Sequence, residues 1–462
     1  MGKISALAVF LPFILIGFVI EARGRKKVTS AVWLPLFWMV ICASRSINQW
    51  LGQYSINSAD SYLEASLTGS PLDRTILTIA IIWGIIIIYK RRESVVGLFR
   101  NNKAVFAFII YLGISFLWSD MPEVSFRRWI RLVGDIIMAT VLMTEPEPLE
   151  SIRSVFRRCA YLLIPLSIML IKYFPQMGVD YAHWSGLQMW RGVALHKNAL
   201  GHLCFVSSFF LFWDALNTLE KRVGMEFSKV IFDAIILMMS LWLLRGPDYS
   251  YSSTSIACLI LGVLIFIGSR APTIKRNFGK IGVPIIIAIC MFLLLEYSVG
   301  LIELIVKVMG RNMTFTDRVP LWNALIDLGL RKPILGYGYG GFWTIERIGM
   351  LDAMGGKALS DFTQAHSGYL ELFVEGGLVA IILLGALLIS LFRKIQRSAL
   401  SNYNYAIFRL SFFFMILLAN FTETSFPSTR TLLTFVFFVI ALNNEPLEKD
   451  QVLKPIYEDR AV

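Results

Sequence analysis

The chain has 462 residues, of which 56% are hydrophobic and 16% are charged, with 44 lysines and arginines against 32 aspartates and glutamates. Soluble domains contain about 45–50% apolar and about 25% charged residues, so this composition excludes a disordered, collagen-like or disulfide-stabilised protein. The formal charge of +12 would suggest nucleic-acid binding in a soluble chain, but the positive-inside rule explains it in a membrane protein.

Apolar stretches recur along most of the chain and predict transmembrane helices, because about 20 apolar residues cross a bilayer as a helix. A helix also satisfies its own backbone hydrogen bonds within lipid. We therefore expect an all-α polytopic membrane protein with about 12–13 transmembrane helices and one large periplasmic loop. The stretches are 4–20, 31–50, 72–89, 104–119, 129–143, 159–174, 199–216, 230–245, 253–269, 282–300, 371–392, 405–421 and 430–443.

Alternate loops between these stretches differ in basic charge, and this difference predicts the orientation of the chain. Loops rich in lysine and arginine face the cytoplasm, which places the N-terminus outside and the C-terminus inside. The basic loops hold Arg23, Arg25, Lys26, Lys27, Lys90, Arg91, Arg92, Arg100, Lys103, Arg153, Arg157, Arg158, Lys221, Arg222, Lys229, Arg270, Lys275, Arg276, Lys280, Arg393, Lys394, Arg397, Lys449, Lys454 and Arg460.

One predicted connection, residues 301–370, is far longer than most connections between helices. Long loops on a rigid scaffold often carry binding and catalytic residues, so we expect a catalytic loop here, on the periplasmic side. The chain then divides into helices 1–10 (1–300), the large loop (301–370), C-terminal helices (371–443) and a cytoplasmic tail (444–462), all within one integral membrane domain.

The cysteines predict neither a disulfide framework nor a metal site. All five lie within apolar stretches, and they form no CxxC pair and no cluster with histidine. The sequence also shows no HExxH motif and no paired-aspartate metal signature. We therefore expect no metal and no cofactor, and phosphate chemistry would have to rely on arginine. The cysteines are Cys42, Cys159, Cys204, Cys258 and Cys290.

Arginine is prominent on the face that we expect to lie outside, and its planar fork matches phosphate and carboxylate oxygens. For Arg74, Arg127 and Arg128, snorkelling to the interface or pairing with a nearby acid is the simpler interpretation. Arg191 and Arg318 are stronger candidates for a site, because each lies in a short polar segment among apolar and aromatic residues.

His366 lies where the long loop returns to the membrane, close to the predicted start of a helix. The helix dipole favours a neutral imidazole there, and a neutral ring can act as a general base. Glu371 and Glu375 are four residues apart and share one face of that helix. Acids at this depth are costly unless they are paired or hydrated, so they are functional candidates, although pairing with outer-face arginines is an equally good interpretation.

The segment 336–343 alternates glycine with aromatic residues. It lacks the Gly-Lys-Ser/Thr ending of a nucleotide-binding P-loop. Its rings could stack on sugars or belong to an aromatic belt at the membrane interface, and the belt is the slightly favoured interpretation. The candidate contacts for an acceptor or a sugar are Tyr337, Tyr339, Trp343, Tyr369 and Glu375.

Several motifs, in this order, resemble the O-antigen ligase and Wzy-type polymerase superfamily. Residues His196–Gly201, which read His-Lys-Asn-Ala-Leu-Gly, resemble the branch of this superfamily that polymerises exopolysaccharides of the succinoglycan type. The motifs are Gly69–Arg74, Leu117–Asp120, Arg191-Gly192, His196–Gly201, Arg318 with Trp322, Leu335–Gly338, and the segment from His366 to Gly377.

The resemblance implies a metal-independent, inverting glycosyltransferase of the bacterial inner membrane, with its active site facing the periplasm. By this resemblance, His366 matches an essential outer-loop histidine, Arg318 an arginine that holds the donor diphosphate, and Arg191 an arginine of an earlier outer loop. The basic residue usual at the start of the ninth span is Ser253 here, and Arg245 is the candidate replacement.

The implied partners are an undecaprenyl-diphosphate-linked oligosaccharide, the lipid bilayer, and a flippase and chain-length regulator of the same pathway, with no nucleic acid. The favoured function is polymerisation of an exopolysaccharide from lipid-linked repeat units. One alternative is a ligase that transfers finished glycan to a lipid A core or another acceptor. A lipid-linked glycan flippase is a further alternative, but transporters usually bind substrates near the bilayer midplane between repeated halves, and this chain shows no repeat.

Overall fold

The computed structural model describes residues 2–23, 28–52, 69–181, 186–221, 227–247, 251–284, 318–355, 362–425 and 431–442, with the single positions 291, 359 and 428. Most of these residues are in helices. The strands found among them are one short antiparallel pair, β1 (Val179–Tyr181) and β2 (Gln188–Trp190), in which Val179 is opposite Trp190.

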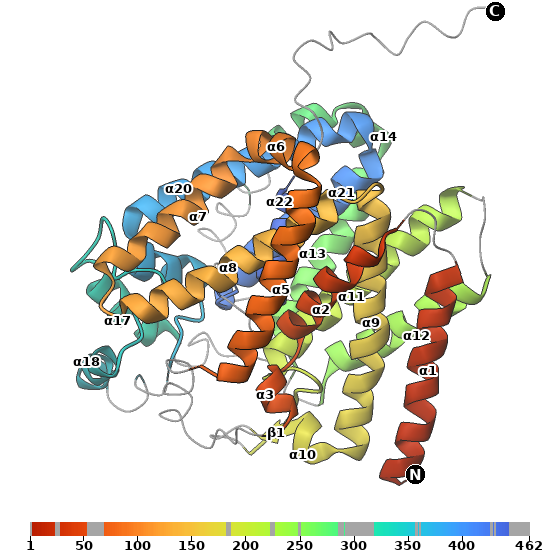
Figure 1. The fold of residues 1–462 in the computed structure, drawn as a ribbon, viewed down its shortest axis with the longest axis horizontal. Coiled ribbons are helices and arrows are strands. Elements are labelled where there is room, and N and C mark those ends of the chain that lie inside the picture. The colour runs from red at the N-terminus through yellow and green to blue at the C-terminus, as the bar shows by residue number, and fades with distance from the viewer. Residues whose placement is uncertain are drawn as a thin grey trace, which may run out of the picture.

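The described helices pack side by side into one bundle (Figure 1). They are α1 (Lys3–Arg23), α2 (Trp33–Ala43), α3 (Ile47–Trp50), α5 (Pro71–Lys90), α6 (Arg92–Asn101), α7 (Lys103–Ile114), α8 (Pro122–Met143), α9 (Pro148–Tyr173), α10 (Pro175–Gly178), α11 (Lys197–Lys221), α12 (Phe227–Arg245), α13 (Ser253–Ser269), α14 (Pro272–Arg276), α17 (Arg318–Gly329), α18 (Ile345–Gly355), α20 (Gly368–Ser401), α21 (Tyr403–Thr422) and α22 (Leu432–Ala441).

Seven helices in the described part of the chain are long and apolar enough to cross a bilayer, and a bent pair formed by α6 and α7 would make eight. Three further apolar helices are shorter, and α8 is long but carries several arginines in its first half. Helical residues are found in every predicted apolar stretch, although most of 282–300 lies outside the described residues. The prediction of an all-α polytopic membrane protein is therefore confirmed, whereas the total of 12–13 spans stays a prediction.

The distribution of apolar side chains fits a bundle surrounded by lipid. Peripheral helices expose large apolar residues, such as Trp83 on α5 (61% exposed) and Ile382 on α20 (69%). Central helices are buried: every residue of α22 is buried, and α9 contributes Phe156 and Tyr161 to the core. In water such exposed residues would form a large apolar patch, whereas hydrocarbon solvates them.

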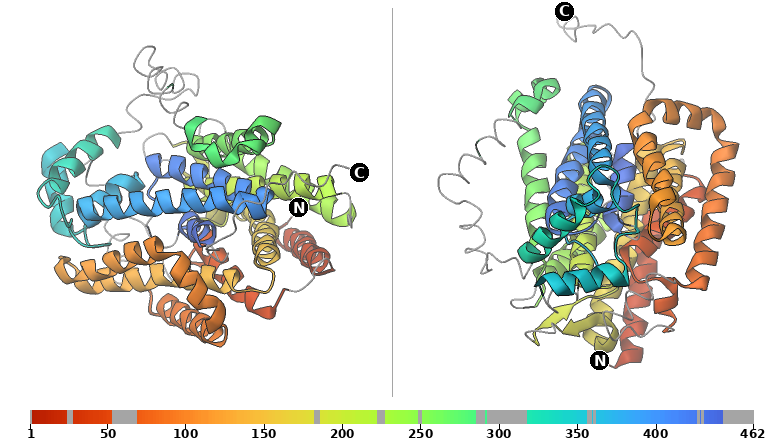
Figure 2. Two further views of the ribbon diagram at one scale, coloured as in Figure 1. Left: turned by 90° about the horizontal axis from the view of Figure 1, so that it is seen from above. Right: turned by 90° about the vertical axis from the view of Figure 1, so that its left-hand side faces the viewer.

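The helices that carry part of the predicted cytoplasmic charge and the helices of the long loop lie at different heights of the bundle. Helices α6 and α14, which contain basic residues, lie at the upper end in Figure 1, whereas α17 and α18 lie lower in the view. Figure 2 shows the teal helices α17 and α18 gathered at one edge, beside the beginning of α20. Which end faces the periplasm stays a prediction.

The structure corrects the placement of Arg153, Arg157 and Arg158, which we expected in a basic loop. All three lie within α9, which begins eleven residues before the predicted span at 159–174. Buried acids of neighbouring helices make this possible: Arg158 Nε lies 2.7 Å from Glu21 Oε2, and Arg157 Nε lies 3.2 Å from Asp233 Oδ1. A buried charge is tolerated when it is paired in this way.

The first part of the predicted long loop, 301–317, lies outside the described residues, but the remainder is largely folded. Its helices α17 and α18 enclose a small apolar core of their own, which includes Leu325, Phe342 and Leu351. This core packs against the beginning of α20 through Val374. The loop is therefore a compact layer on the end of the bundle.

This layer packs against a kink in α20. Gly377 has φ 63° and ψ −166°, outside the helical region, and a Cβ atom there would lie 2.2 Å from the carbonyl oxygen of Ile334. Leu378 N instead donates a hydrogen bond to Pro333 O (2.8 Å), and Gly338 N donates to Glu375 O (2.8 Å). Glycine has no Cβ and adopts positive φ readily, so the backbone of the loop can lie against the broken helix.

Candidate functional site

His366 has an unusual backbone conformation immediately before α20. Its φ of 49° makes it the non-glycine residue with positive φ among the residues that the structure describes. The preceding peptide is held on both sides: Ala365 N donates to Glu371 Oε2 (2.7 Å), and Trp322 Nε1 donates to Ala365 O (2.8 Å). Such strain persists where neighbours over-determine the conformation, and it often marks functional sites.

The imidazole of His366 faces the carboxylate of Glu423, which follows the end of α21. Its Nδ1 atom lies 4.0 Å from Glu423 Oε2 and is buried without a hydrogen-bond partner in the described structure. The backbone joins the two residues as well, because Gly368 N donates to Glu423 O (3.2 Å). The histidine side chain keeps 20% of its surface exposed, so it is held in place but accessible.

Glu423 also binds two other residues from distant parts of the chain. Asn198 Nδ2 donates to Glu423 Oε1 (2.7 Å), and Arg318 Nη2 lies 3.2 Å from the same oxygen. Arg318 donates in addition to the carbonyl oxygen of Thr422. Burial alone raises the pKa of a carboxyl group, but the neighbouring His366 and Arg318 outweigh this effect and lower the pKa of Glu423 to about 2. Glu423 is therefore ionised at neutral pH.

Two predicted site residues lie elsewhere. Arg191 donates from Nε to Met177 O (3.1 Å) and from Nη2 to Gln176 O (3.1 Å), so it contacts the backbone of the turn at α10. Arg245 is exposed at the end of α12 and lines a separate hollow of about 410 Å³, together with Trp190 and Trp242. The structure thus brings His366 and Arg318 together but places Arg191 and Arg245 in other surroundings.

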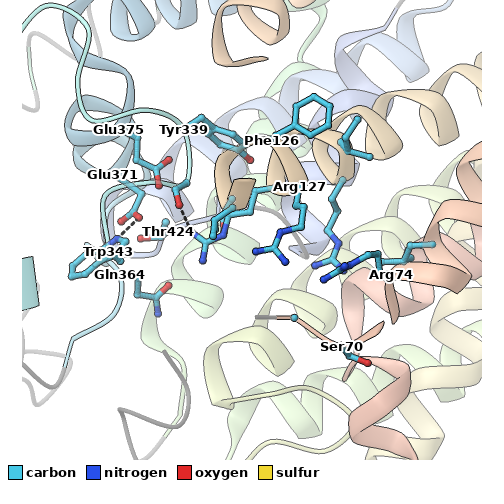
Figure 3. A pocket seen from close by; sticks show the side chains of 18 of the residues that line it. Ser70, Arg74, Phe126, Arg127, Tyr339, Trp343, Gln364, Glu371, Glu375 and Thr424 are labelled. Atoms are coloured by element: carbon cyan, nitrogen blue, oxygen red, sulfur yellow. Dashed lines mark hydrogen bonds between the residues drawn. The ribbon is translucent and has the colours of Figure 1, made fainter. Parts of the chain in front are cut away.

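A cavity of about 400 Å³ opens beside the His366 cluster, and Figure 3 shows side chains that line it. Gln364, two residues before His366, and Thr424, next to Glu423, line it and so connect it with the cluster. Arginines of α5 and α8 form one side, and the beginning of α20 with the glycine-aromatic segment forms the other. The charged and aromatic lining residues are Arg74, Phe126, Arg127, Arg128, Arg131, Tyr339, Trp343, Glu371 and Glu375.

The aromatic residues of the segment 336–343 are buried, with Tyr337 7%, Tyr339 2% and Trp343 3% exposed. They therefore do not form the exposed interfacial belt that the sequence slightly favoured. Tyr339 and Trp343 line the cavity, whereas the Tyr337 hydroxyl donates to Leu328 O (3.0 Å) within the small core. Tyr369 has a packing role as well, because its hydroxyl donates to Leu417 O (2.9 Å) on α21.

Glu371 and Glu375 lie on one face of α20, as their spacing predicts, and both line the cavity. The carboxylate of Glu371 is used structurally: Oε1 accepts from Trp343 Nε1 (2.6 Å) and Oε2 from Ala365 N. It thereby links the aromatic wall of the cavity to the backbone beside His366. Glu375 also lines the cavity, where the backbone of Gly340 donates a hydrogen bond to its carboxylate.

Sequence reasoning did not single out Glu423 and Arg131. Glu423 follows the predicted span 405–421, and an acid at the end of a span is a signal that could have identified it. Arg131 lies within the predicted span 129–143, where the apolar pattern of the span gives no sign of its role. Arg127 and Arg128, which snorkelling explained more simply, line the cavity instead.

Comparisons with known proteins agree with the motifs. Residues 238–385 match the family model of the O-antigen ligase. The chain is also 26% identical, over 310 residues, to the exopolysaccharide production protein ExoQ of Rhizobium meliloti (strain 1021), in an alignment that covers 65% of this chain and 66% of that protein. The predicted resemblance is confirmed. The region matched by the family model contains Arg318, His366, Glu371 and Glu375. It does not contain Glu423 or the arginines of α8.

Proposed function

Starting from the resemblance to O-antigen ligases and to ExoQ, we propose that this protein is a polysaccharide polymerase. It joins undecaprenyl-diphosphate-linked repeat units into an exopolysaccharide at the periplasmic face of the bacterial inner membrane. The comparisons support the broader role of a polysaccharide polymerase or ligase. The observation that supports glycosyl transfer is the His366–Glu423–Arg318 cluster beside a cavity with basic, acidic and aromatic walls, and the similarity to an exopolysaccharide production protein favours the polymerase.

In the proposed reaction, a hydroxyl oxygen of the acceptor sugar attacks the anomeric carbon of the donor from the side opposite the diphosphate. The bond between the anomeric carbon and the diphosphate oxygen breaks, and its electron pair leaves with the lipid diphosphate. The configuration at the anomeric carbon is inverted. His366 takes the hydroxyl proton during the attack, since the hydroxyl is a weak nucleophile while it keeps that proton.

Glu423 supports this role of His366 through its charge. A carboxylate beside Nδ1 favours the tautomer with its proton on Nδ1, which leaves Nε2 as the base. It also stabilises the imidazolium that forms when Nε2 takes the proton, as an acid does in a catalytic triad. Arg318, held beside Glu423, stabilises the negative charge that develops on the departing diphosphate, and no metal is required by this scheme.

The decisive experiment is reconstitution of the purified protein with synthetic lipid-diphosphate repeat units, followed by sizing of the glycan. His366→Gln keeps a hydrogen-bonding side chain but removes the base, so polymer formation should fall by about 10²-fold or more. Arg100→Gln, on the exposed surface of α6 at the other end of the bundle, should retain normal activity. Normal polymer from His366→Gln at equal protein level would contradict the proposal.

A ligase is the second candidate, because the matching family model is that of O-antigen ligases. The same cluster would perform the same chemistry, and only the acceptor would differ. A deletion strain separates the two: it should accumulate single lipid-linked repeats if the protein is a polymerase, and full-length lipid-linked chains if it is a ligase. Glycan extension in detergent, where no compartments exist, would exclude the flippase alternative.

A further inference from the structure

Four arginines from two helices border the cavity beside the His366 cluster. Arg127, Arg128 and Arg131 lie on α8, and Arg74 lies near the beginning of α5. Residues 127 and 131 are four apart and 128 and 131 are three apart, so their side chains share a face of the helix. An oxyanion bound beside this face could therefore accept hydrogen bonds from more than one guanidinium group.

The arginines are built into the fold rather than spread over an open surface. The side chain of Arg128 reaches the glycine-aromatic segment, where Nη1 donates to Gly340 O (2.7 Å). Gly340 has φ 66°, and a Cβ atom there would lie 2.5 Å from Arg128 Cδ. The segment is therefore shaped to receive this arginine, which joins the basic wall to the opposite wall.

The opposite wall has a different chemistry. Figure 3 shows the carboxylates of Glu371 and Glu375, with Trp343, on one side of the cavity, and Arg127 and Arg74 on the other. Carboxylates accept hydrogen bonds from sugar hydroxyls, and an indole ring can stack on a sugar face. The basic wall suits phosphate or carboxylate oxygens. At about 400 Å³, the cavity lies within the range of about 300–1,000 Å³ that is usual for small-ligand sites.

We propose that Arg74, Arg127, Arg128 and Arg131 form an oxyanion-binding site for the glycan substrate, separate from Arg318, with the adjoining sugar directed toward Glu375 and Trp343. The proposal rests on the proposed function, because that function supplies a substrate with both chemical groups. The oxyanion is either the diphosphate of a lipid-linked unit or the carboxylate of an acidic sugar. The apolar rim of the cavity, with Phe126 44% and Ile130 36% exposed, is compatible with the lipid chain of the first.

Ligand titrations on the full chain in phosphatidylcholine nanodiscs test this site without requiring catalysis. One arm uses farnesyl diphosphate, with farnesol as the uncharged comparison. The other uses a glucuronate-containing tetrasaccharide, with a neutral tetrasaccharide as the comparison. The variants are Arg127→Gln/Arg131→Gln and Arg127→Lys/Arg131→Lys, and Arg100→Gln is the matched control.

We expect one of the two anionic probes to bind the wild-type protein at least tenfold more tightly than its neutral comparison. The double glutamine variant should weaken that binding at least tenfold, and the double lysine variant should weaken it several-fold, because lysine keeps the charge but loses the fork. Arg100→Gln should bind normally. The probe that shows this arginine dependence identifies the oxyanion as the lipid diphosphate or the acidic sugar.

Equal binding of anionic and neutral probes would overturn the proposal, and so would normal affinity in both arginine variants. If the glutamine variant does not fold, the lysine variant decides the question alone. His366→Gln should bind the probes normally. If binding depends on the arginines and His366→Gln is active, the catalytic assignment is rejected and this site is kept. If binding does not depend on the arginines and His366→Gln is inactive, only this site is rejected.

Discussion

At the scale of single residues, the carboxylate of Glu423 joins parts of the chain that are far apart in sequence. Asn198 is 225 positions away and Arg318 is 105 positions away, and the same residue faces His366. Motif order indicated His366 and Arg318 from the sequence. It could not indicate their common partner, because a contact over such separations follows from the packing of α11, α17 and α21 and leaves no local pattern.

Replacement of Glu423 by glutamine should lower the rate of glycan transfer by roughly 10–150-fold. A hydrogen bond or ion pair to a charged group contributes about 1.5–3 kcal/mol, and glutamine keeps the shape while removing the charge that orients His366 and Arg318. Initial rates with saturating lipid-linked donor measure this change. Arg100→Gln, on the exposed surface of α6, should leave the rate nearly unchanged; an equal loss in both variants would argue against a specific role for Glu423.

The low pKa of Glu423 predicts a pH-dependent contribution to stability. The pKa is about 2 in the folded protein and about 4.3 for an unperturbed glutamate, so the carboxylate stabilises the fold above pH 4.3. This contribution is lost as the pH falls from about 4.3 to about 2. The difference in thermal stability between wild type and Glu423→Gln should shrink as the pH falls from about 4.3 toward 2. A difference that grows over this acidic range would show the opposite sign of coupling.

At the scale of elements, α20 and the loop that packs on it form the wall of the site. The apolar run at 371–392 predicted a helix, and the helix is present as Gly368–Ser401. The kink at Gly377 was not predicted, because two adjacent glycines in an apolar run do not reveal which backbone will approach them. The start of α9 was misplaced for a related reason: its first turns carry arginines whose partners, such as Glu21, lie on other helices.

The kink gives a second stability prediction. Gly377→Ala should destabilise the protein by about 2 kcal/mol or more, since an L-residue with positive φ costs roughly 1–2 kcal/mol and its Cβ would meet Ile334 O at 2.2 Å. Gly385→Ala in the same helix has no atom within 4 Å of the new Cβ and should stabilise it by about 0.5–1 kcal/mol. Thermal unfolding in detergent compares the two. Equal effects would mean that the kink does not constrain the fold.

At the scale of the whole molecule, composition and hydropathy were sufficient to predict a bundle of membrane helices. They were less able to predict its interior, where charged groups pair between helices. Arg158 is fully buried and lies against Glu21 of α1, so the first helix is held to the centre of the bundle by an ion pair as well as by apolar packing. Hydropathy treats such residues as markers of a loop, since it contains no information about their partners.

This ion pair predicts how α1 is attached. Arg158→Met leaves the carboxylate of Glu21 buried without its cation and should destabilise the protein by about 3–5 kcal/mol. Adding Glu21→Leu removes the isolated charge and should recover most of this loss. Unfolding of the two single variants and the double variant completes the cycle. If the double variant is as unstable as the sum of the singles, the pair does not couple α1 to α9.

The kink in α20 also has a consequence for the depth of the site in the bilayer. A helix rises about 1.5 Å per residue, so residues 378–397 span about 30 Å, which matches a hydrocarbon layer of about 30 Å when the basic side chains near residue 397 reach the opposite interface. The nine residues before the kink, with Glu371 and Glu375, can then remain at the level of the lipid headgroups. A thicker membrane would draw these acids toward the acyl chains, and transfer activity should therefore fall as the chain length of the surrounding lipids increases.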